Sequence, residues 1–297
     1  MRLSEYFPAE RVLRDAVFDA LGLSNTDIKA RLLSFFEDMR FAAELNENRH
    51  ICAVICKKED VAQLAEHIEG VVVSEHPRRA YFELHNRLAG EAGYAPALTP
   101  TVIGRDCKIS PWAMIDPLAV KLGDGVTVED FAVIKGPCEI GDGCVLRAGV
   151  KVGGVGYEFK IFGDKVLDVA HCGGVRIGKN VILWENATVH RAVYPWDLTE
   201  IGEGCRIGAH AHIDHGTKLG SYVKVCAGAI LSGRCAVGSH STVGPGSVLS
   251  NRICVGEGAH VVLGSVVTKS VADGERVSGN FAIEHKKHME SVKRQAL

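Results

Sequence analysis

The stretch "TVIGRDCKISPWAMID", residues 101–116, places an aliphatic residue at every sixth position. Ile103, Ile109 and Ile115 are the first members of this series. A helix repeats its apolar residues every 3.6 positions, and a half-buried strand repeats them every second position. A period of six therefore predicts a short strand and a turn that recur along the chain.

The six-residue period continues through most of the remaining chain, with a one-residue slip, one break and one twelve-residue step. Every further position in the series is Ile, Leu or Val: Leu122, Val128, Ile134, Ile140, Leu146, Val152, Ile177, Leu183, Val189, Ile201, Ile207, Ile213, Leu219, Val225, Leu231, Val237, Val243, Leu249, Val255, Val261 and Val267. Three units would close one triangular coil with the aliphatic residues inside. Such coils would stack about 4.8 Å apart through parallel-strand hydrogen bonds. We expect a mainly β protein in which residues 100–272 form a parallel β-helix.

The repeat has two interruptions and two flanks. Residues 153–176 and 190–200 predict loop insertions, which are common places for binding residues. Residues 1–99 lack the period and predict a small α/β domain with a possible nucleotide-binding role. Residues 273–297 predict a turn followed by an amphipathic helix.

Within the first domain, the local patterns favour particular elements. The segments "SEYFPAERVLRDAVFDALG" (4–22) and "KEDVAQLAEHIE" (58–69) favour helices, and "HICAVICK" (50–57) favours a strand. The segment "HPRRAYFELHNRLAGEAG" (76–93) favours a helix that a glycine ends.

Composition excludes several classes of function. The net charge is −2 and the sequence pI is about 6.7, and no segment is basic enough for a nucleic-acid surface. The N-terminal segment is charged throughout, and no apolar run reaches the roughly 18 residues of a membrane span. We expect a cytoplasmic protein with no integral membrane segment and no nucleic-acid partner.

The stretch "IGAHAHIDHGTKLG", residues 207–220, contains three histidines. His215 lies two residues after the aliphatic Ile213, a phase that points away from the interior. Gly233 follows one 18-residue coil later and should stack on His215. A neutral imidazole can act as a general base near pH 7, and a backbone N–H can stabilise an oxyanion.

We therefore expect His215 to be a general base and the Gly233 N–H to be the oxyanion donor, with no covalent intermediate. Asp197 lies one 18-residue coil before His215, so we expect it to orient the imidazole. His212 lies near a corner and is expected to be structural or to line the cleft. The roles of His190 and His240 stay open at this point.

Several motifs resemble one family, the UDP-3-O-(3-hydroxyacyl)glucosamine N-acyltransferases of lipid A synthesis. The resembling segments are "LSFFEDMRF", "GGVGYEF", "HCGGVRIG", "ENATVHRA" and "HIDHGTKLG". These enzymes belong to the hexapeptide-repeat acyltransferases, which form left-handed parallel β-helices. The resemblance covers residues 30–272 and implies a small nucleotide-binding domain before the β-helix and a helical tail after it.

The resemblance also implies substrates, partners and site residues. It implies acyl transfer from acyl-CoA or acyl carrier protein to the amine of a nucleotide-linked amino sugar, in lipid A or surface glycan synthesis. It implies a homotrimer with no bound cofactor and no metal. The substrate-binding residues would be Phe35 and Phe41 on either side of a uracil ring, Asp38 as its polar contact, and Tyr157, His171, Glu185, Asn186, Arg191 and Arg252.

The chain departs from the family pattern at two of these positions. Asp38 stands where the family has Asn, and "SNR", with Arg252, stands where the family has a second active-site histidine. These departures bear on the identity of the sugar and the acyl donor.

Three alternatives remain. The chain could be an O-acetyltransferase of a small molecule, although such enzymes do not need the first domain. It could be a zinc protein like the γ-class carbonic anhydrases, since His210 and His215 have the spacing of two of their ligands but a different phase in the repeat. It could also be a catalytically inactive scaffold or regulatory subunit.

Overall fold

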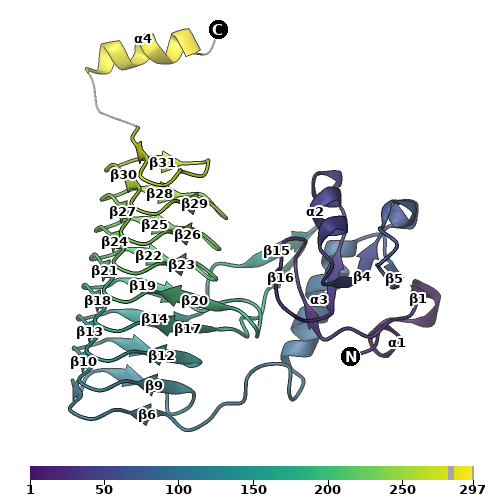
Figure 1. Cartoon of the computed structure of the whole chain (residues 1–297), viewed down its shortest axis with the longest axis horizontal. Helices are drawn as coiled ribbons and strands as arrows, with labels where there is room; N and C mark the ends of the chain where they lie inside the picture. The colour runs from purple at the N-terminus through teal and green to yellow at the C-terminus, as the bar shows by residue number, and fades with distance from the viewer. Residues whose placement is uncertain (280–283, 296–297) are drawn as a thin grey trace. The chain divides into compact units, whose positions relative to one another are not determined.

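The computed structural model describes residues 1–279 and 284–295 and divides the chain into two compact units (Figure 1). The first unit comprises Met1–Pro96, Tyr157–Cys172 and Val193–Pro195. The second comprises Ala97–Gly156, Gly173–Ala192 and Trp196–Leu297. Of the expected C-terminal segment 273–297, residues 280–283 and 296–297 lie outside the described residues, and α4 spans His285–Gln295.

Three parallel sheets form the repeat region of the second unit. The first sheet contains β7 (Lys108–Ile109), β10 (Thr127–Val128), β13 (Val145–Leu146), β18 (Ile182–Leu183), β21 (Arg206–Ile207), β24 (Lys224–Val225), β27 (Thr242–Val243), β30 (His260–Val261) and β32 (Arg276–Val277). The second sheet contains β8 (Met114–Ile115), β11 (Val133–Ile134), β14 (Lys151–Gly154), β19 (Thr188–His190), β22 (His212–Ile213), β25 (Ile230–Leu231), β28 (Val248–Leu249) and β31 (Val266–Val267). The third sheet contains β6 (Val102–Ile103), β9 (Val120–Leu122), β12 (Cys138–Ile140), β17 (Gly174–Ile177), β20 (Leu198–Ile201), β23 (Lys218–Leu219), β26 (Ala236–Val237) and β29 (Cys254–Val255).

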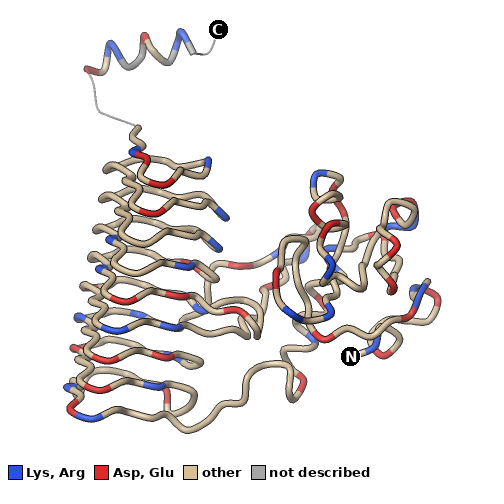
Figure 2. Tube along the Cα trace, viewed as in Figure 1, with Lys and Arg blue, Asp and Glu red and all other residues tan. Residues whose placement is uncertain are grey.

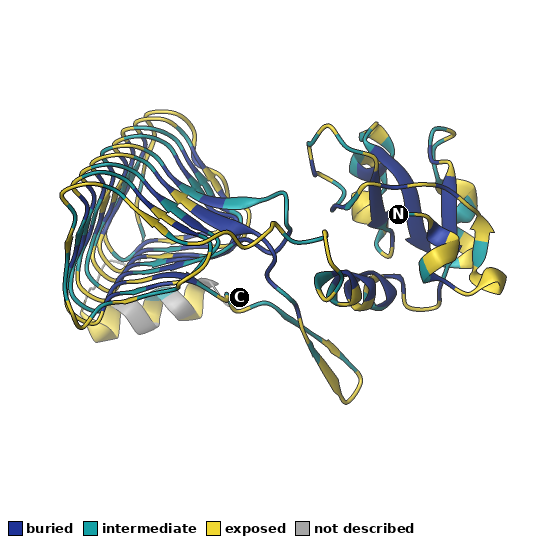
Figure 3. Ribbon diagram, turned by 90° about the horizontal axis from the view of Figure 1, so that it is seen from below, coloured by how far each residue is buried: buried dark blue, intermediate teal, exposed yellow. Residues whose placement is uncertain are grey.

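The predicted left-handed parallel β-helix is confirmed. Each coil takes one strand from each sheet, and the coils enclose a triangular interior (Figure 3). The aliphatic series fills that interior: Ile134, Leu183 and Ile213 each have no exposed surface. The first coil is the exception, because no coil covers its outer side and Ile103 is 48% exposed.

Coil length varies along the repeat, and this variation matters for the site. β19 and β22 pair with Thr188 opposite His212, a step of 24 residues. The next coil returns to 18 residues, with His212 opposite Ile230. The longer coil holds the insertion predicted at 190–200. Because of this longer coil, residues 24 positions apart in the sequence, rather than 18, lie beside each other on the second sheet.

A column of alternating charges follows the outer face of the third sheet (Figure 2). Glu139 pairs with Lys121 at 2.9 Å and lies 3.7 Å from Arg176. Glu200 lies 3.6 Å from Arg176 and pairs with Lys218 at 2.9 Å. Each partner occupies the same register position one coil away, so the column runs through five successive strands with alternating sign.

A five-stranded sheet forms the core of the first unit, in the order β1-β5-β4-β3-β2. Its strands are β1 (Val12–Arg14), β2 (Ala20–Leu21), β3 (Leu32–Phe35), β4 (Ile51–Cys56) and β5 (Gly70–Val73). Its helices are α1 (Leu3–Tyr6), α2 (Ala42–Glu47) and α3 (Pro77–Ala89), with 3-10 turns η1 (Ala9–Arg11), η2 (Met39–Phe41) and η3 (Lys58–Gln63).

The helical prediction for residues 4–22 is wrong for most of that segment. Val12 lies opposite Val72 in the antiparallel pair β1–β5, so this edge pairing overrides the local helical preference. The prediction for residues 58–69 yields only the 3-10 turn Lys58–Gln63. The strand predicted at 50–57 and the helix predicted at 76–93 are present as β4 and α3.

The two loops that interrupt the repeat supply part of the first unit. Residues 157–172 form an antiparallel hairpin of β15 (Phe159–Phe162) and β16 (Lys165–Asp168), which α3 holds through three hydrogen bonds. Asn86 donates to Asp168 O at 2.7 Å and accepts from Ala170 N at 2.9 Å, and His85 Nε2 donates to Ala170 O at 2.8 Å. Tyr194 is buried in the same unit, where its hydroxyl accepts from the Tyr81 hydroxyl at 3.1 Å.

Candidate active site

Three polar side chains meet at the corner that leads from the second sheet to the third, which we call the histidine corner. They are His190, at the end of β19, and Asp214 and His215, directly after β22. Asp214 Oδ1 lies 3.1 Å from His190 Nδ1 and 3.0 Å from His215 Nδ1, and it also accepts from the His215 backbone N–H at 2.8 Å. Asp214 is 9% exposed and His215 is 8% exposed, so this network lies largely out of water.

The hydrogen-bond pattern determines the histidine tautomers. An ionised carboxylate only accepts, so both ring nitrogens that contact Asp214 carry hydrogen. In a neutral His215 the lone pair is then on Nε2. That atom faces Gly233, where a Cβ would come within 2.5 Å of it. The predicted stacking of Gly233 one coil after His215 is therefore present in the structure.

Two pKa shifts follow from this arrangement. Burial alone would raise the pKa of Asp214, but the hydrogen bonds from His190 and His215 outweigh burial and hold that pKa well below its usual range. Burial lowers the pKa of His212, and the charge of a protonated His190 would lower it further. Asp214 is therefore an anion and His212 a neutral ring at physiological pH.

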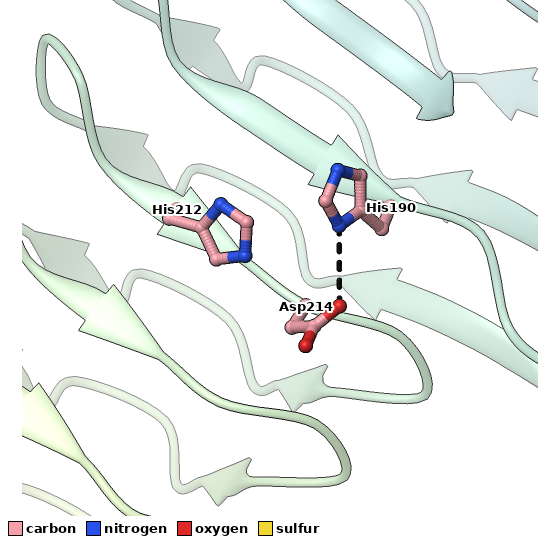
Figure 4. A group of neighbouring side chains, drawn as sticks. All are labelled: His190, His212 and Asp214. Carbon is pink, nitrogen blue, oxygen red and sulfur yellow. Dashed lines mark hydrogen bonds and ion pairs between the residues drawn. The ribbon is translucent and has the colours of Figure 1, made fainter. Parts of the chain in front are cut away.

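His212 lies beside the network and was expected only to be structural or to line a cleft. Its ring lies edge-on to the ring of His190, with the ring centres 4.8 Å apart. One ligand-type atom from each of His190, His212 and Asp214 lies within 4.8 Å of the other two (Figure 4). Such a group can exchange protons or hold a cation.

Two predicted substrate-binding arginines lie at the same corner as His215. Arg191 follows His190 directly, and its Nη1 donates to Gly136 O at 2.9 Å. Arg252 lies one coil after Gly233, and its backbone N–H donates to Gly233 O at 3.1 Å. Arg234 directly follows Gly233, and its backbone N–H donates to His215 O at 2.9 Å.

The expectation that Asp197 orients His215 is wrong. Its carboxylate accepts from Lys218 Nζ at 3.0 Å and from Leu198 N at 2.8 Å. β20 and β23 keep the 18-residue step, and Asp197 lies against Gly216, where a Cβ would lie 3.0 Å from its Oδ2. Asp214, adjacent to His215 in sequence, orients the imidazole instead.

Glu185 and Asn186 do not lie at the histidine corner. They follow β18, at the corner between the first and second sheets, where Glu185 O accepts from His210 N at 3.0 Å. Asn186 has a φ of 59° and its N–H donates to Ala148 O at 3.1 Å. Within one chain, these two residues therefore lie at a different corner of the β-helix from His215.

Tyr157 and His171 lie in the insertion that belongs to the first unit. Tyr157 is 80% exposed, and its ring lies edge-on to that of Phe159 at 5.0 Å. His171 is buried, with Nδ1 donating to Val169 O at 2.9 Å. This hydrogen bond orients the His171 ring at the base of the hairpin.

The predicted uracil-binding residues lie around β3 and η2 of the first unit. Phe35 packs against Tyr81 at 5.0 Å, whereas Phe41 is 39% exposed. Asp38 caps η2 by accepting from Arg40 N at 2.9 Å. Hydrogen bonds from the Arg40 side chain and backbone lower the pKa of Asp38.

His210 and His215 do not come together within the chain. His210 is exposed at the corner between the first and second sheets, with a φ of 56°, while His215 is buried at the histidine corner. The spacing that suggested a carbonic-anhydrase-like pair therefore does not produce a shared cluster in one chain.

A family model described as "Bacterial transferase hexapeptide (six repeats)" matches residues 119–154 and 198–233. The second range includes Asp214, His215 and Gly233. The chain carries the hexapeptide repeat of bacterial transferases. The resemblance to hexapeptide-repeat acyltransferases expected from the sequence is confirmed. No helix in the described part of the chain has the length and apolar character needed to cross a bilayer.

Two curated relatives share parts of the hexapeptide region. One is an acyl-[acyl-carrier-protein]–UDP-N-acetylglucosamine O-acyltransferase of Thermodesulfovibrio yellowstonii, 32% identical over 132 residues, or 44% of this chain and 48% of that protein. The other is a UDP-3-O-acylglucosamine N-acyltransferase of Methylococcus capsulatus, 34% identical over 97 residues, or 32% of this chain and 27% of that protein. The chain thus spans half or less of the length of these relatives.

Solved structures share the fold of the hexapeptide region. The UDP-N-acetylglucosamine acyltransferase of Arabidopsis aligns with a TM-score of 0.52 and 25% identity over 66% of this chain and 73% of that one. The enzyme of the same name from Campylobacter jejuni gives a TM-score of 0.54 and 23% identity, over 65% of this chain and 78% of that one.

Sequence reasoning missed Asp214 as the partner of His215 and left His190 unassigned. A signal for Asp214 was available, because the motif "HIDH" places a carboxylate beside the expected base. The contact of His190 with Asp214 depends on the coil length. The two residues are 24 positions apart, so a search for neighbours at 18-residue steps does not pair them.

Proposed function

We propose that this chain is an acyltransferase that moves an acyl group from a thioester donor to the amine of a nucleotide-linked amino sugar. Acyl carrier protein or coenzyme A would carry the acyl group, and the product would enter lipid A or surface glycan synthesis. The observation that carries this proposal is the Asp214–His215 pair, with His215 Nε2 facing Gly233. The relatives support the substrate class, because their names specify UDP-linked glucosamine acceptors.

The proposed chemistry uses the atoms at the histidine corner. His215 Nε2 takes a proton from the acceptor amine while the amine nitrogen attacks the thioester carbonyl carbon. Asp214 keeps the proton on Nδ1 and stabilises the imidazolium that forms. The Gly233 N–H donates to the carbonyl oxygen as it becomes an oxyanion, a contribution often worth about 10²–10³ in rate. The intermediate then collapses to an amide, and the departing thiolate takes the proton from His215.

Gly233 meets two requirements of this role. Its N–H has no acceptor among the described residues, so it is available to a substrate oxygen. The absence of a side chain leaves the space in front of His215 Nε2 open, since any Cβ there would lie 2.5 Å from that atom.

The first unit would hold the nucleotide in this proposal. Phe41 offers an exposed ring for stacking, and Asp38 offers a carboxylate beside it in the same turn. Arg191 and Arg252 would contact the substrate at the histidine corner. We further infer a cytoplasmic homotrimer, as the resemblance implies.

O-acylation is the second candidate, because O-acyltransferases are among the similar proteins. The same base would then take a proton from a sugar hydroxyl. The two activities differ in the bond they form, and this difference can be measured directly.

The test supplies purified protein with acyl carrier protein or coenzyme A thioesters and with UDP-, dTDP- or GDP-linked sugars, each as amino and N-acetyl forms. We expect a product with an amide, which resists hydroxylamine, whereas an ester product would establish O-acylation. His215→Ala should lower kcat roughly 10²- to 10⁴-fold. Gly233→Ala should also lower kcat, because its Cβ displaces His215.

Ala227→Ser is the matched control for Gly233→Ala. It adds one heavy atom at the equivalent turn position of another corner, where Ala227 is exposed. It should keep full activity. No transfer to any nucleotide sugar, or full activity of His215→Ala, would refute the proposal.

A further inference from the structure

The outer face of the second sheet presents three potential metal ligands close together. Side chains alternate between the two faces of a strand, so His212 and Asp214 flank the inward Ile213 and share the outer face. The 24-residue coil places Thr188 opposite His212, and hence His190 opposite Asp214. His212 and Asp214 therefore lie on one strand segment, and His190 lies on the neighbouring strand directly across from Asp214.

The distances within this group suit a single ion. One ligand-type atom from each of His190, His212 and Asp214 lies within 4.8 Å of the other two. The rings of His190 and His212 meet edge-on, which directs nitrogen atoms toward the space beside Asp214 (Figure 4). An ion would bind each of the three at about 2.0–2.2 Å.

A second observation concerns the unused oxygen of Asp214. All three hydrogen bonds to this carboxylate go to Oδ1, from His190, His215 and the His215 backbone. Oδ2 accepts no hydrogen bond from the residues that the structure describes, although Asp214 is only 9% exposed. Oδ2 is not among the fully buried polar atoms, so its lone pairs are open to an incoming cation.

We propose that His190, His212 and Asp214 form a site for a divalent transition-metal ion such as Zn²⁺. Two imidazoles and one carboxylate are a ligand set that Zn²⁺ accepts, and a fourth, open position would remain for water. The ion replaces the proton now shared between His190 Nδ1 and Asp214. Mg²⁺ and Ca²⁺, which prefer oxygen ligands, do not compete.

Occupancy of this site would affect the reaction, a consequence that rests on the proposed function. The carboxylate of Asp214 would be neutralised by the ion and would no longer stabilise an imidazolium at His215. The ion would therefore inhibit acyl transfer while leaving the fold in place.

Direct metal binding tests the site without reference to activity. Chain stripped with a chelator is titrated with ZnSO₄ by calorimetry, and its Co²⁺ form is examined for the visible absorption of a four-coordinate ion. We expect one ion per chain, and a loss of at least tenfold in affinity in His212→Asn and in His190→Asn.

His210→Asn is the matched control. His210 lies two residues before His212 but is exposed at another corner, and Asn tolerates its φ of 56°. It should change the affinity less than twofold. Circular dichroism and thermal melting of each variant verify folding. No stoichiometric binding, or an equal loss in His210→Asn, would overturn the proposal.

Inhibition is measured separately, once a substrate pair is known. Zinc binding with loss of transfer supports both the site and its link to His215. Zinc binding without inhibition leaves the site standing and removes the role assigned to Asp214 in the reaction. Absence of zinc binding removes the site and leaves the acyltransferase proposal to its own test.

Discussion

At the scale of single residues, Asp214 organises the site because it accepts from two histidines at once. Its Oδ1 binds His190 Nδ1 at 3.1 Å and His215 Nδ1 at 3.0 Å. Hydrogen bonds to a charged acceptor are stronger than those between neutral groups. The carboxylate therefore determines the tautomer of His215, and with it which nitrogen is available as a base.

Asp214→Asn tests this role by keeping the shape and removing the charge. An amide oxygen accepts more weakly and does not stabilise an imidazolium, so kcat should fall roughly 10²- to 10⁴-fold with little change in KM. Steady-state kinetics, with the acceptor and donor that the transfer assay identifies, measures both constants. Asp197→Asn is the control, since Asp197 binds Lys218, and it should stay within a few-fold of the native chain.

The same substitution has a consequence for stability against pH. The pKa of Asp214 is depressed in the folded chain, so its stabilising contribution is present above its unfolded pKa of about 3.9 and is lost as the pH falls through the folded value. The gap in unfolding free energy between native chain and Asp214→Asn should therefore be larger at pH 7 than at pH 3. Denaturant titrations at the two pH values measure it, and an equal gap at both would contradict the assignment.

At the scale of elements, the charge column on the third sheet shows how stacked strands select their neighbours. Arg176 lies between Glu139 and Glu200, and each pairing crosses one coil. Cross-strand pairs of opposite charge contribute about 0.2–1 kcal/mol each, and like charges destabilise. These side chains are about half exposed, so the lower end of that range applies.

Reversing one charge in this column should destabilise the repeat measurably. Arg176→Glu places three carboxylates in succession, and we expect the melting temperature to fall by about 2–4 °C in low salt. In 1 M salt the fall in melting temperature should be much smaller, because the Debye length is then only about 3 Å and the repulsion between the carboxylates is screened. Lys224→Glu is the control on the first sheet, where Lys224 lies beside Arg206 and reversal removes a like-charge neighbour.

The repeat could be predicted from sequence because its core depends on local spacing alone. One aliphatic residue in six fills the same position in every coil, so the pattern predicts the interior. The first unit was harder: Val12–Arg14 is a strand only because β5 lies beside it, 57 or more residues later in the chain. The sequence placed Gly233 against His215 correctly, one regular coil apart. It was wrong at Asp197, where β20 and β23 keep the 18-residue step but the carboxylate binds Lys218.

At the scale of the whole chain, the two units do not correspond to two uninterrupted stretches of sequence. The first unit takes Tyr157–Cys172 and Val193–Pro195 from between strands of the repeat. The α3 side chains His85 and Asn86 hold the hairpin through its backbone, and Tyr81 holds Tyr194. Folding of the first unit therefore depends on segments that the chain supplies much later.

Asn86→Ala tests this dependence. It removes two hydrogen bonds to the hairpin, each worth about 1 kcal/mol, so amide hydrogen exchange in residues 159–170 should accelerate roughly tenfold or more. Hydrogen exchange read by mass spectrometry resolves this segment. Glu83→Ala on the exposed side of the same helix should leave hairpin exchange unchanged, and an equal effect there would contradict the assignment.

The 24-residue coil has a consequence beyond this site. Adding one hexapeptide to a coil keeps every aliphatic residue in phase, so the core tolerates it, yet it changes which outer residue faces a given position of the next coil. Here it places His190 opposite Asp214, where the two side chains share a hydrogen bond. Insertions of whole repeat units are thus a route by which such a scaffold can acquire a new set of surface groups while its interior stays the same.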